Sequence, residues 1–282
     1  VHMNPDDIER VGCDGKLELV APFQAPGADA FRWLFYASNP PWSNTRLSLR
    51  AIREGQREFL MRLGNVHSFF TIYANIAGFD PSAGPVNEPE MRHSLDRWIL
   101  HEFTTLTGRV VERMDDLHLY EAARDIQQFV EGLSNWYVRR SRRRFWGEGS
   151  DANDALSTLY EVLVGVSKLI APFVPFTAEA MYRSLVGSVV DGSPVSVHHC
   201  SYPTPNESLL DESLAKGMAI TRELSSLGLA ARSKVGVRVR QPLEAVEVVL
   251  ADASLQGLIE DLSDLLVEEL NVREVRFSEN AE

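Results

Sequence analysis

Apolar residues that recur every three or four positions dominate this sequence, and they restrict most of the chain to helices that pack through one face. The longest of these stripes contains Leu95, Ile99, Phe103, Leu106, Val110, Met114 and Leu117. Residues three and four apart lie on the same side of an α-helix, so the stripe predicts one amphipathic helix of about six turns.

Three further stripes predict the neighbouring helices. One covers residues 119–145, and the next begins with Asp151 or Asn153 as its N-cap. The inward residues of that helix are expected to be Leu156, Leu159, Leu163, Val166 and Ile170. Pro175 suits the first turn of a fourth helix, which Gly187 closes. Four helices with short connectors predict an antiparallel bundle.

The segments on either side of this bundle differ from it. A helix with Ala30, Trp33, Leu34 and Ala37 inward, a long helix over 47–77 and a Gly- and Pro-rich linker at 78–90 come before it. After about residue 203, a helix near 207–232 is followed by strand, helix and strand patterns, which predict a small α/β unit with a right-handed crossover. The fold class is therefore mainly α, with a small α/β domain at 204–282. Residues 1–26 are unassigned, although "KLELVAPF" fits a short strand.

Charge and composition limit the functions open to this chain. It has 40 Asp and Glu against 28 Lys and Arg, a formal net charge of −12, so any contact with a polyanion must be local. Cys13 and Cys200 are its two cysteines and form no C-x-x-C pair, which argues for a reducing cytoplasm and against a cysteine zinc site. No run is long and apolar enough to span a membrane, and "VHMNPDDIERVG" lacks the pattern of a secretory signal, so neither export nor membrane insertion is expected.

Catalytic and metal-binding motifs are not expected. The sequence has no phosphate-binding glycine loop and no nucleophile elbow, so it predicts no catalytic residue. "VHHC" at 197–200 invites a metal, but adjacent side chains of an extended segment point to opposite faces and cannot converge on one ion. We therefore expect no metal site.

The stretch "NWYVRRSRRRFW" at 135–146 contains five arginines and four aromatic residues. On a helix, Trp136, Arg139, Arg140 and Arg143 line one side, and Arg144 overlaps it. Arginine forks bind phosphate oxygens in pairs, and aromatic rings stack on unpaired bases. The alternative is a solvated helix end with Tyr137 and Trp146 in the core. Because uncompensated arginines on a helix repel one another, the stretch favours an RNA partner.

Several strings together resemble the carboxy-terminal portion of isoleucyl-tRNA synthetases, over about residues 27–278. They are "GADAFRWLFYASNPPWSNTRLS", "SFFTIYANIAGFDP", "DRWILHEFTTLTGRV", "NWYVRRSRRRFW", "LIAPFVPFTAEAMYRSL", "SVHHCSYP", "KVGVRVRQPL" and "ELNVREVRF". The family's nucleotide-binding signatures and editing domain do not occur in these 282 residues, so the chain is expected to be a fragment.

The resemblance implies a division of the chain and a set of contacts. Residues 27–90 would be junction helices from the absent catalytic domain, and 91–203 the anticodon-binding bundle. The implied RNA-binding residues are Asn135, Trp136, Arg139, Arg140, Arg143, Arg144, Lys234, Arg238 and Arg240. For the last three, a solvated turn is the alternative.

The resemblance also implies partners and cofactors. The partner would be isoleucine tRNA, beside the parent's own catalytic and editing domains, in a monomer. The parent would use ATP and magnesium, with zinc as a further candidate, whereas this fragment would need no cofactor and catalyse nothing. A valyl or leucyl parent, or a helical protein-interaction module, remains the alternative.

Overall fold

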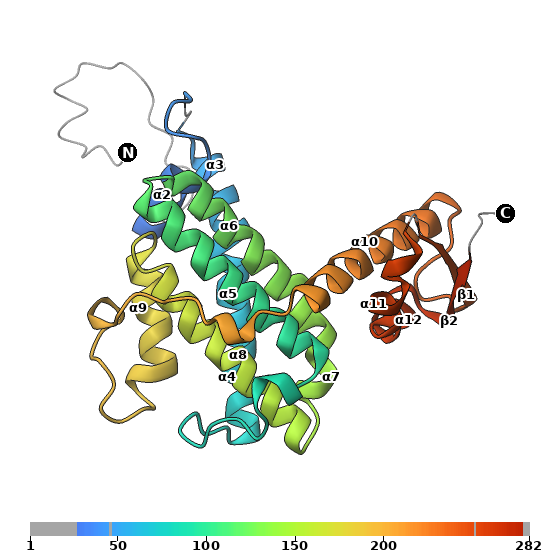
Figure 1. Cartoon of the computed structure of the whole chain (residues 1–282). Coiled ribbons are helices and arrows are strands. Elements are labelled where there is room, and N and C mark those ends of the chain that lie inside the picture. The colour runs from blue at the N-terminus through green and yellow to red at the C-terminus, as the bar shows by residue number, and fades with distance from the viewer. Residues whose placement is uncertain (1–26, 45–46, 251, 279–282) are drawn as a thin grey trace, which may run out of the picture.

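The computed structural model describes residues 27–44, 47–250 and 252–278, and these residues are mainly helical (Figure 1). A helical bundle forms the larger part. The long helix α10 (Glu212–Lys234) projects from it, and a pair of strands with two short helices packs on α10 (Figure 1). The predicted class, a helical bundle followed by a small α/β part, is confirmed. The predicted strand in "KLELVAPF" lies outside the described residues.

Four helical stretches form the predicted bundle. They are α5 (Ser94–Asp115); α6 (Leu119–Gly132), a π-helical segment (Leu133–Val138) and α7 (Arg139–Phe145); α8 (Ser150–Leu169); and α9 (Pro175–Tyr182) with a π-helical segment (Arg183–Gly187). Their apolar stripes face one shared core, in which Leu95, Ile126 and Leu159 are almost completely buried.

The helices that come before the bundle pack against several of its members. They are α2 (Ala28–Ala37), then α3 (Leu49–Gly55), a π-helical segment (Gln56–Met61) and α4 (Arg62–Ala77), which run on as one stretch. Helix α2 contacts α6 and α9, whereas α4 contacts α8 and the π-helical segment Leu133–Val138. Asp29 of α2 accepts a hydrogen bond of 2.6 Å from the backbone N–H of Thr177 and so caps α9 from a distance. Arg32 donates to the carbonyl of Phe173 at 2.9 Å. The predicted helix with Ala30, Trp33, Leu34 and Ala37 inward is confirmed as α2, and the long helix predicted over 47–77 is confirmed from Leu49 to Ala77, with a π-helical segment inside it.

Two local expectations about the bundle are wrong. Leu117 is 79% exposed and has a φ of +62°, a left-handed conformation that cannot continue a helix, so the buried stripe of α5 ends before it. The N-cap of α8 is Gly149, with no side-chain cap bond, and neither Asp151 nor Asn153 takes that role. Asp151 instead accepts hydrogen bonds from Arg144.

The C-terminal unit, residues 212–278, contains the predicted strand, helix and strand. β1 (Leu243–Val249) pairs in parallel with β2 (Val272–Ser278), and α11 (Gln256–Glu260) and α12 (Ser263–Leu270) connect them. Short 3₁₀ turns occur at Pro89–Met91, Val197–His199, Glu207–Leu209 and Ala253–Leu255. The helix expected from about 207 begins at Glu212, because Asp211 caps it by accepting from the backbone N–H of Leu214.

Close packing fixes α12 on α10. A Cβ atom on Gly228 of α10 would lie 2.6 Å from Leu270 Cδ2, so only glycine allows this approach. Arg232, which is 5% exposed, donates to the carbonyl of Leu270 at 2.7 Å and to that of Gln241 at 2.9 Å. The first of these bonds satisfies a carbonyl group at the end of α12. Across the described ranges, no helix is long and apolar enough to cross a membrane.

Candidate nucleic-acid interface

The arginine-rich stretch begins in a π-helical segment, and this changes where its side chains point. Leu133–Val138 forms the π-helix, and α7 continues from Arg139. A π-helical turn contains about one more residue than an α-helical turn, so it rotates the residues that follow it. Trp136 is 7% exposed and Tyr137 is fully buried. The stretch therefore does not present one continuous face to solvent.

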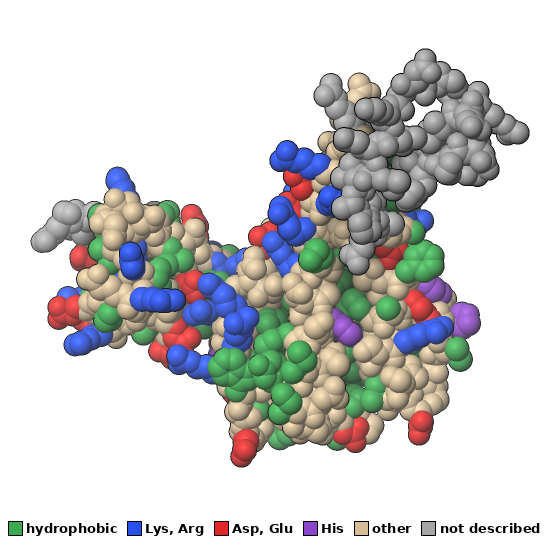
Figure 2. Space-filling view, turned by 180° about the vertical axis from the view of Figure 1, so that it is seen from behind, with side chains coloured by type: hydrophobic (Ala, Val, Ile, Leu, Met, Phe, Trp, Pro, Cys, Tyr) green, Lys and Arg blue, Asp and Glu red, His purple; other side chains and the backbone are tan. Residues whose placement is uncertain are grey.

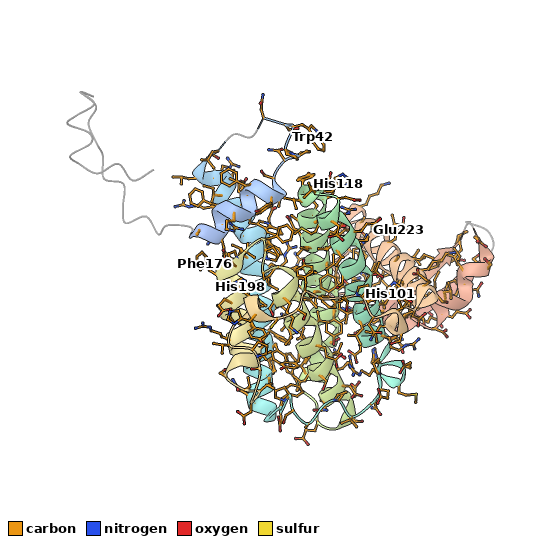
Figure 3. The ribbon with its side chains drawn as sticks, turned by 60° about the vertical axis from the view of Figure 1, so that its left-hand side comes forward. Trp42, His101, His118, Phe176, His198 and Glu223 are labelled. Atoms are coloured by element: carbon orange, nitrogen blue, oxygen red, sulfur yellow. The ribbon has the colours of Figure 1, made fainter. Side chains whose placement is uncertain are left out.

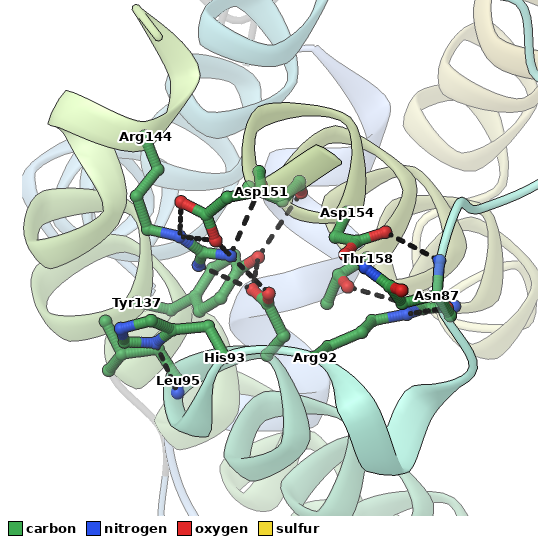
Figure 4. A network of polar contacts seen from close by, with 11 residues as sticks. Asn87, Arg92, His93, Leu95, Tyr137, Arg144, Asp151, Asp154 and Thr158 are labelled. Carbon is green, nitrogen blue, oxygen red and sulfur yellow. Dashed lines mark hydrogen bonds and ion pairs between the residues drawn. The ribbon is translucent and has the colours of Figure 1, made fainter. Parts of the chain in front are cut away.

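Arg144 is held inside the bundle (Figure 4). Its guanidinium donates to both carboxylate oxygens of Asp96, the first at 2.8 Å, and its Nε donates to Asp151 at 2.9 Å. Asp96 is completely buried and also accepts from the Tyr137 hydroxyl at 2.7 Å. Two carboxylates of the bundle therefore already use the donors of Arg144, and its contact with RNA stays a prediction.

This network shifts the pKa values of its members. Burial would lower the pKa of Arg144, but the hydrogen bonds with Asp96 and Asp151 outweigh burial and raise it. Burial, followed by the charge of Asp96, raises the pKa of the Tyr137 phenol well above its usual value. The hydrogen bond from Arg144 lowers the pKa of Asp151. Arg144 and Asp151 are therefore charged and Tyr137 is neutral at physiological pH.

Arg139 and Arg140 connect the bundle to the C-terminal unit. Arg139 donates a short hydrogen bond to Glu269 of α12, and Arg140 Nη1 lies 3.1 Å from the same carboxylate. The Glu269 side chain is 5% exposed. Arg143 lies farther out, since its side chain is 85% exposed and its Nη1 is 3.8 Å from Glu268 Oε1. Two of the predicted RNA-binding arginines thus bind a glutamate of the same chain.

An open groove remains beside these ion pairs. This arginine groove is lined by Arg142, Arg143, Trp146, Glu268 and Asn271, among others. Trp146 is 59% exposed, and no carboxylate pairs with Arg142 in the described part of the chain. Figure 2 shows Lys and Arg side chains gathered where the C-terminal unit meets the bundle.

Two residues of the arginine groove, Arg142 and Trp146, are absent from the predicted contacts. Both belong to the same stretch, "NWYVRRSRRRFW", and its density of arginine and aromatic residues is the sequence signal that could have identified them. Regular helical spacing also points to them, because α7 is an α-helix from Arg139 and positions 139, 142, 143 and 146 lie three or four residues apart on one face.

A second groove lies between the π-helical segment and α10. This Arg222 groove is lined by Asn135, Trp136, Arg139, Arg222, Glu223 and Glu269, among others. Asn135 is exposed at its rim, whereas Trp136 forms its wall and donates from Nε1 to the sulfur of Met218 at 3.1 Å. The structure thus brings three of the predicted residues together with Arg222 and Glu223, which no local motif marked.

The second predicted basic patch lies at the turn from α10 to β1. Lys234, Arg238 and Arg240 are exposed there. Buried Arg232 shapes this turn, since it donates to the carbonyl of Arg238 at 3.3 Å. Asn271, which lines the arginine groove, donates to the carbonyl of Val239 in the same turn at 2.8 Å. The patch therefore adjoins the arginine groove, and its contact with RNA stays a prediction.

The histidines of "VHHC" lie away from both grooves. They belong to the 3₁₀ turn Val197–His199, and Figure 3 shows His198 on the far side of the bundle from Glu223. Within residues 27–44, 47–250 and 252–278, no group of three His, Cys, Asp or Glu side chains is arranged to hold a metal ion.

Curated relatives share most of this sequence. The isoleucine–tRNA ligase of Dehalococcoides mccartyi (strain 195) is 44% identical over 259 residues, which cover 90% of this chain and 25% of that protein. The isoleucine–tRNA ligase of Clostridium acetobutylicum is 41% identical over 267 residues, covering 93% and 25%. The chain therefore spans about a quarter of the length of these relatives.

One solved structure that matches is the ternary complex of Agrobacterium radiobacter K84 agnB2 LeuRS with tRNA and LeuAMS. The match has a TM-score of 0.47 and 18% sequence identity, and it covers 66% of this chain and 20% of that one. This likeness is too slight to place individual residues. A family model described as the anticodon-binding domain of tRNA ligase matches residues 96–248, from the first turn of α5 into β1. More than half of the chain lies in that match, and the chain belongs to the anticodon-binding domain family of tRNA ligases.

Proposed function

We propose that this chain binds the anticodon stem and loop of isoleucine tRNA as part of an isoleucine–tRNA ligase. The observation that carries the proposal is the arginine groove, which presents Arg142, Arg143 and exposed Trp146 together, three residues that lie inside the family match at residues 96–248. The names of the curated relatives support isoleucine as the amino acid of the longer protein.

The chemistry of the arginine groove suits an RNA loop. Arg142 and Arg143 offer planar forks that bind phosphate oxygens, and they lie beside an exposed indole ring. A base that stacks on an aromatic ring of this kind contributes about 1–3 kcal/mol. Because the whole chain carries a net charge of −12, its RNA contact depends on local gatherings of arginine such as this one.

The activity of the longer protein is also a proposal. It would join isoleucine to its tRNA with ATP and magnesium in the cytoplasm, and its catalytic and editing residues would lie in the three quarters of the relatives' length that this chain does not span. Phe35, Trp42 and Leu117 are each more than half exposed and line one hollow. Figure 3 shows Trp42 and His118 at the same end of the bundle. This apolar end suits the contact with the rest of a longer protein.

Fluorescence anisotropy with a labelled anticodon stem-loop of isoleucine tRNA tests the RNA contact. The logarithm of the affinity should fall linearly with the logarithm of salt concentration, by about 0.7–0.9 per phosphate contacted. The double variant Arg142→Ala/Arg143→Ala should bind more weakly and reduce this slope by about 1.5. The control is Arg50→Ala/Arg183→Ala, which removes the same charge from two exposed arginines on α3 and the segment after α9.

Two results would count against the proposal. If both double variants lost affinity equally, general charge would explain the binding and the arginine groove would not. If the chain bound stem-loops with unrelated anticodons as tightly, the proposed specificity would be wrong, and preference for a valine or leucine anticodon would reassign the parent enzyme.

A further inference from the structure

Arg222 of α10 differs from the arginines around it. Its guanidinium carbon lies 5.5 Å from the ring centroid of Trp98 and 5.8 Å from that of Trp136. Among the described residues no carboxylate forms an ion pair with it, although its side chain is exposed. Arg139, Arg140 and Arg144, by contrast, all bind carboxylates of the chain. Arg222 therefore keeps its donors available while its place is fixed by two aromatic rings.

Both rings beneath Arg222 are themselves held in place. Trp98 is 2% exposed and donates from Nε1 to Glu102 at 3.2 Å, and Trp136 is 7% exposed and donates to Met218. The start of α10 is also fixed on α5, because His101 Nδ1 accepts from the backbone N–H of Asp211 at 2.9 Å. A planar cation on α10 thus rests on two fixed indole rings of the bundle.

The charges of the Arg222 groove are balanced, which separates it from the arginine groove. Arg139 and Arg222 face Glu223 and Glu269, and Figure 3 shows Glu223 on α10 between the bundle and the C-terminal unit. The glutamates repel a phosphate at this position, so the groove favours a neutral group over an anion. The arginine groove, which presents Arg142 and Arg143, is the better phosphate site.

A nucleobase meets these requirements. Guanidinium planes and aromatic rings stack on bases that have left their helical stack, and amide and carboxylate groups read the base edges. Asn135 at the rim offers one donor group and one acceptor, whereas Glu223 offers only acceptors. Acceptor oxygens at the rim of the groove favour a base that carries an exocyclic amino group, because that group donates hydrogen bonds.

We infer that the Arg222 groove is a subsite for one unstacked, amino-bearing base of the RNA loop, with Arg222 as the stacking group and Asn135 and Glu223 as specificity-determining residues. This subsite rests on the proposed RNA function and adds a base contact to the phosphate contacts of the arginine groove. Arg222 is then the arginine whose planar shape, and not its charge alone, matters for binding.

The test uses anisotropy with stem-loop RNAs in which each loop base in turn is replaced by an abasic site. Arg222→Met should weaken binding of the intact stem-loop roughly 5- to 150-fold, the range expected for one stacked base. It should leave the salt slope unchanged, because no phosphate contact is lost. One abasic RNA should bind wild type and Arg222→Met equally, which identifies the base that the groove takes. Arg222→Lys, which keeps the charge without the planar group, should bind like Arg222→Met.

Each other outcome overturns the inference. Equal affinities of wild type and Arg222→Met for the intact RNA would place the base elsewhere. Full affinity with Arg222→Lys, or a smaller salt slope with Arg222→Met, would make Arg222 a phosphate contact. A loss with Arg222→Met that every abasic RNA shares would point to altered packing of Trp98 and Trp136. If wild type bound no stem-loop at all, the proposed function itself would fail, whereas the preceding outcomes leave it in place.

Discussion

Replacing Arg144 with methionine tests whether this arginine stabilises the bundle or binds RNA. The substitution keeps much of the side-chain volume but leaves the carboxylate of Asp96, which is completely buried, with the Tyr137 hydroxyl and without its cation. Removing one partner of a buried ion pair costs about 3–5 kcal/mol. The contact with Asp151, whose side chain is 56% exposed, adds little. Arg144→Met should therefore destabilise the fold by about 3–5 kcal/mol.

Thermal and urea unfolding followed by circular dichroism measure this loss. For a domain of about 150–250 residues, 1 kcal/mol lowers Tm by about 2–4 °C, so a decrease of about 6–20 °C is expected. The matched control is Arg143→Met, whose side chain is 85% exposed and which should change stability by less than about 0.5 kcal/mol. The double variant Asp96→Asn/Arg144→Met should recover much of the loss because no unpaired charge stays buried.

The opposite pattern would refute this reasoning. If Arg144→Met unfolded within about 0.5 kcal/mol of wild type, the ion pair with Asp96 would not stabilise the bundle. At a temperature where the variant is folded, its affinity for the RNA stem-loop should equal that of wild type. A loss of affinity in the folded variant would return Arg144 to the RNA interface.

Three further outcomes are expected. Glu269→Gln should weaken the contact of α12 with Arg139 and Arg140 by about 1–3 kcal/mol. Backbone amides of the C-terminal unit should then exchange hydrogen faster, whereas those of the bundle should not. Unchanged exchange would mean that other contacts hold the C-terminal unit on the bundle. Gly165→Ala should destabilise the fold by about 1–3 kcal/mol, because the new Cβ atom would lie 2.3 Å from the ring of Phe103. Gly64→Ala is the control: a Cβ atom there would meet open space, so the fold should not be destabilised. Burial and the charge of Arg144 lower the pKa of His93. Near pH 6.5 the unfolded chain therefore binds more protons at this residue than the folded chain does. The free energy of unfolding should consequently decrease as the pH is lowered from 7.5 to 5.5. His93→Asn should reduce this dependence, and an unchanged dependence would assign it to other groups.

The resemblance and the helical stripes predicted much of this protein correctly. The bundle, the parallel strand pair and the anticodon-binding family are confirmed, because helical and strand periodicity are local properties and the family match rests on residues 96–248. Leu117 and the N-cap of α8 were wrong for a local reason, since a left-handed residue and a glycine end or begin a helix without any change in the apolar pattern.

The sequence by itself determined which faces of the helices are buried, because residues three and four apart meet on one side of any α-helix. Only the tertiary structure decided which arginines are available to a partner. Arg144 is used by Asp96, 48 positions away, and Arg139 by Glu269, 130 positions away, whereas Arg142 and Arg222 have no such carboxylate among the described residues. Ion pairs form between side chains that packing brings within a few ångströms, and no local spacing in the chain encodes that proximity.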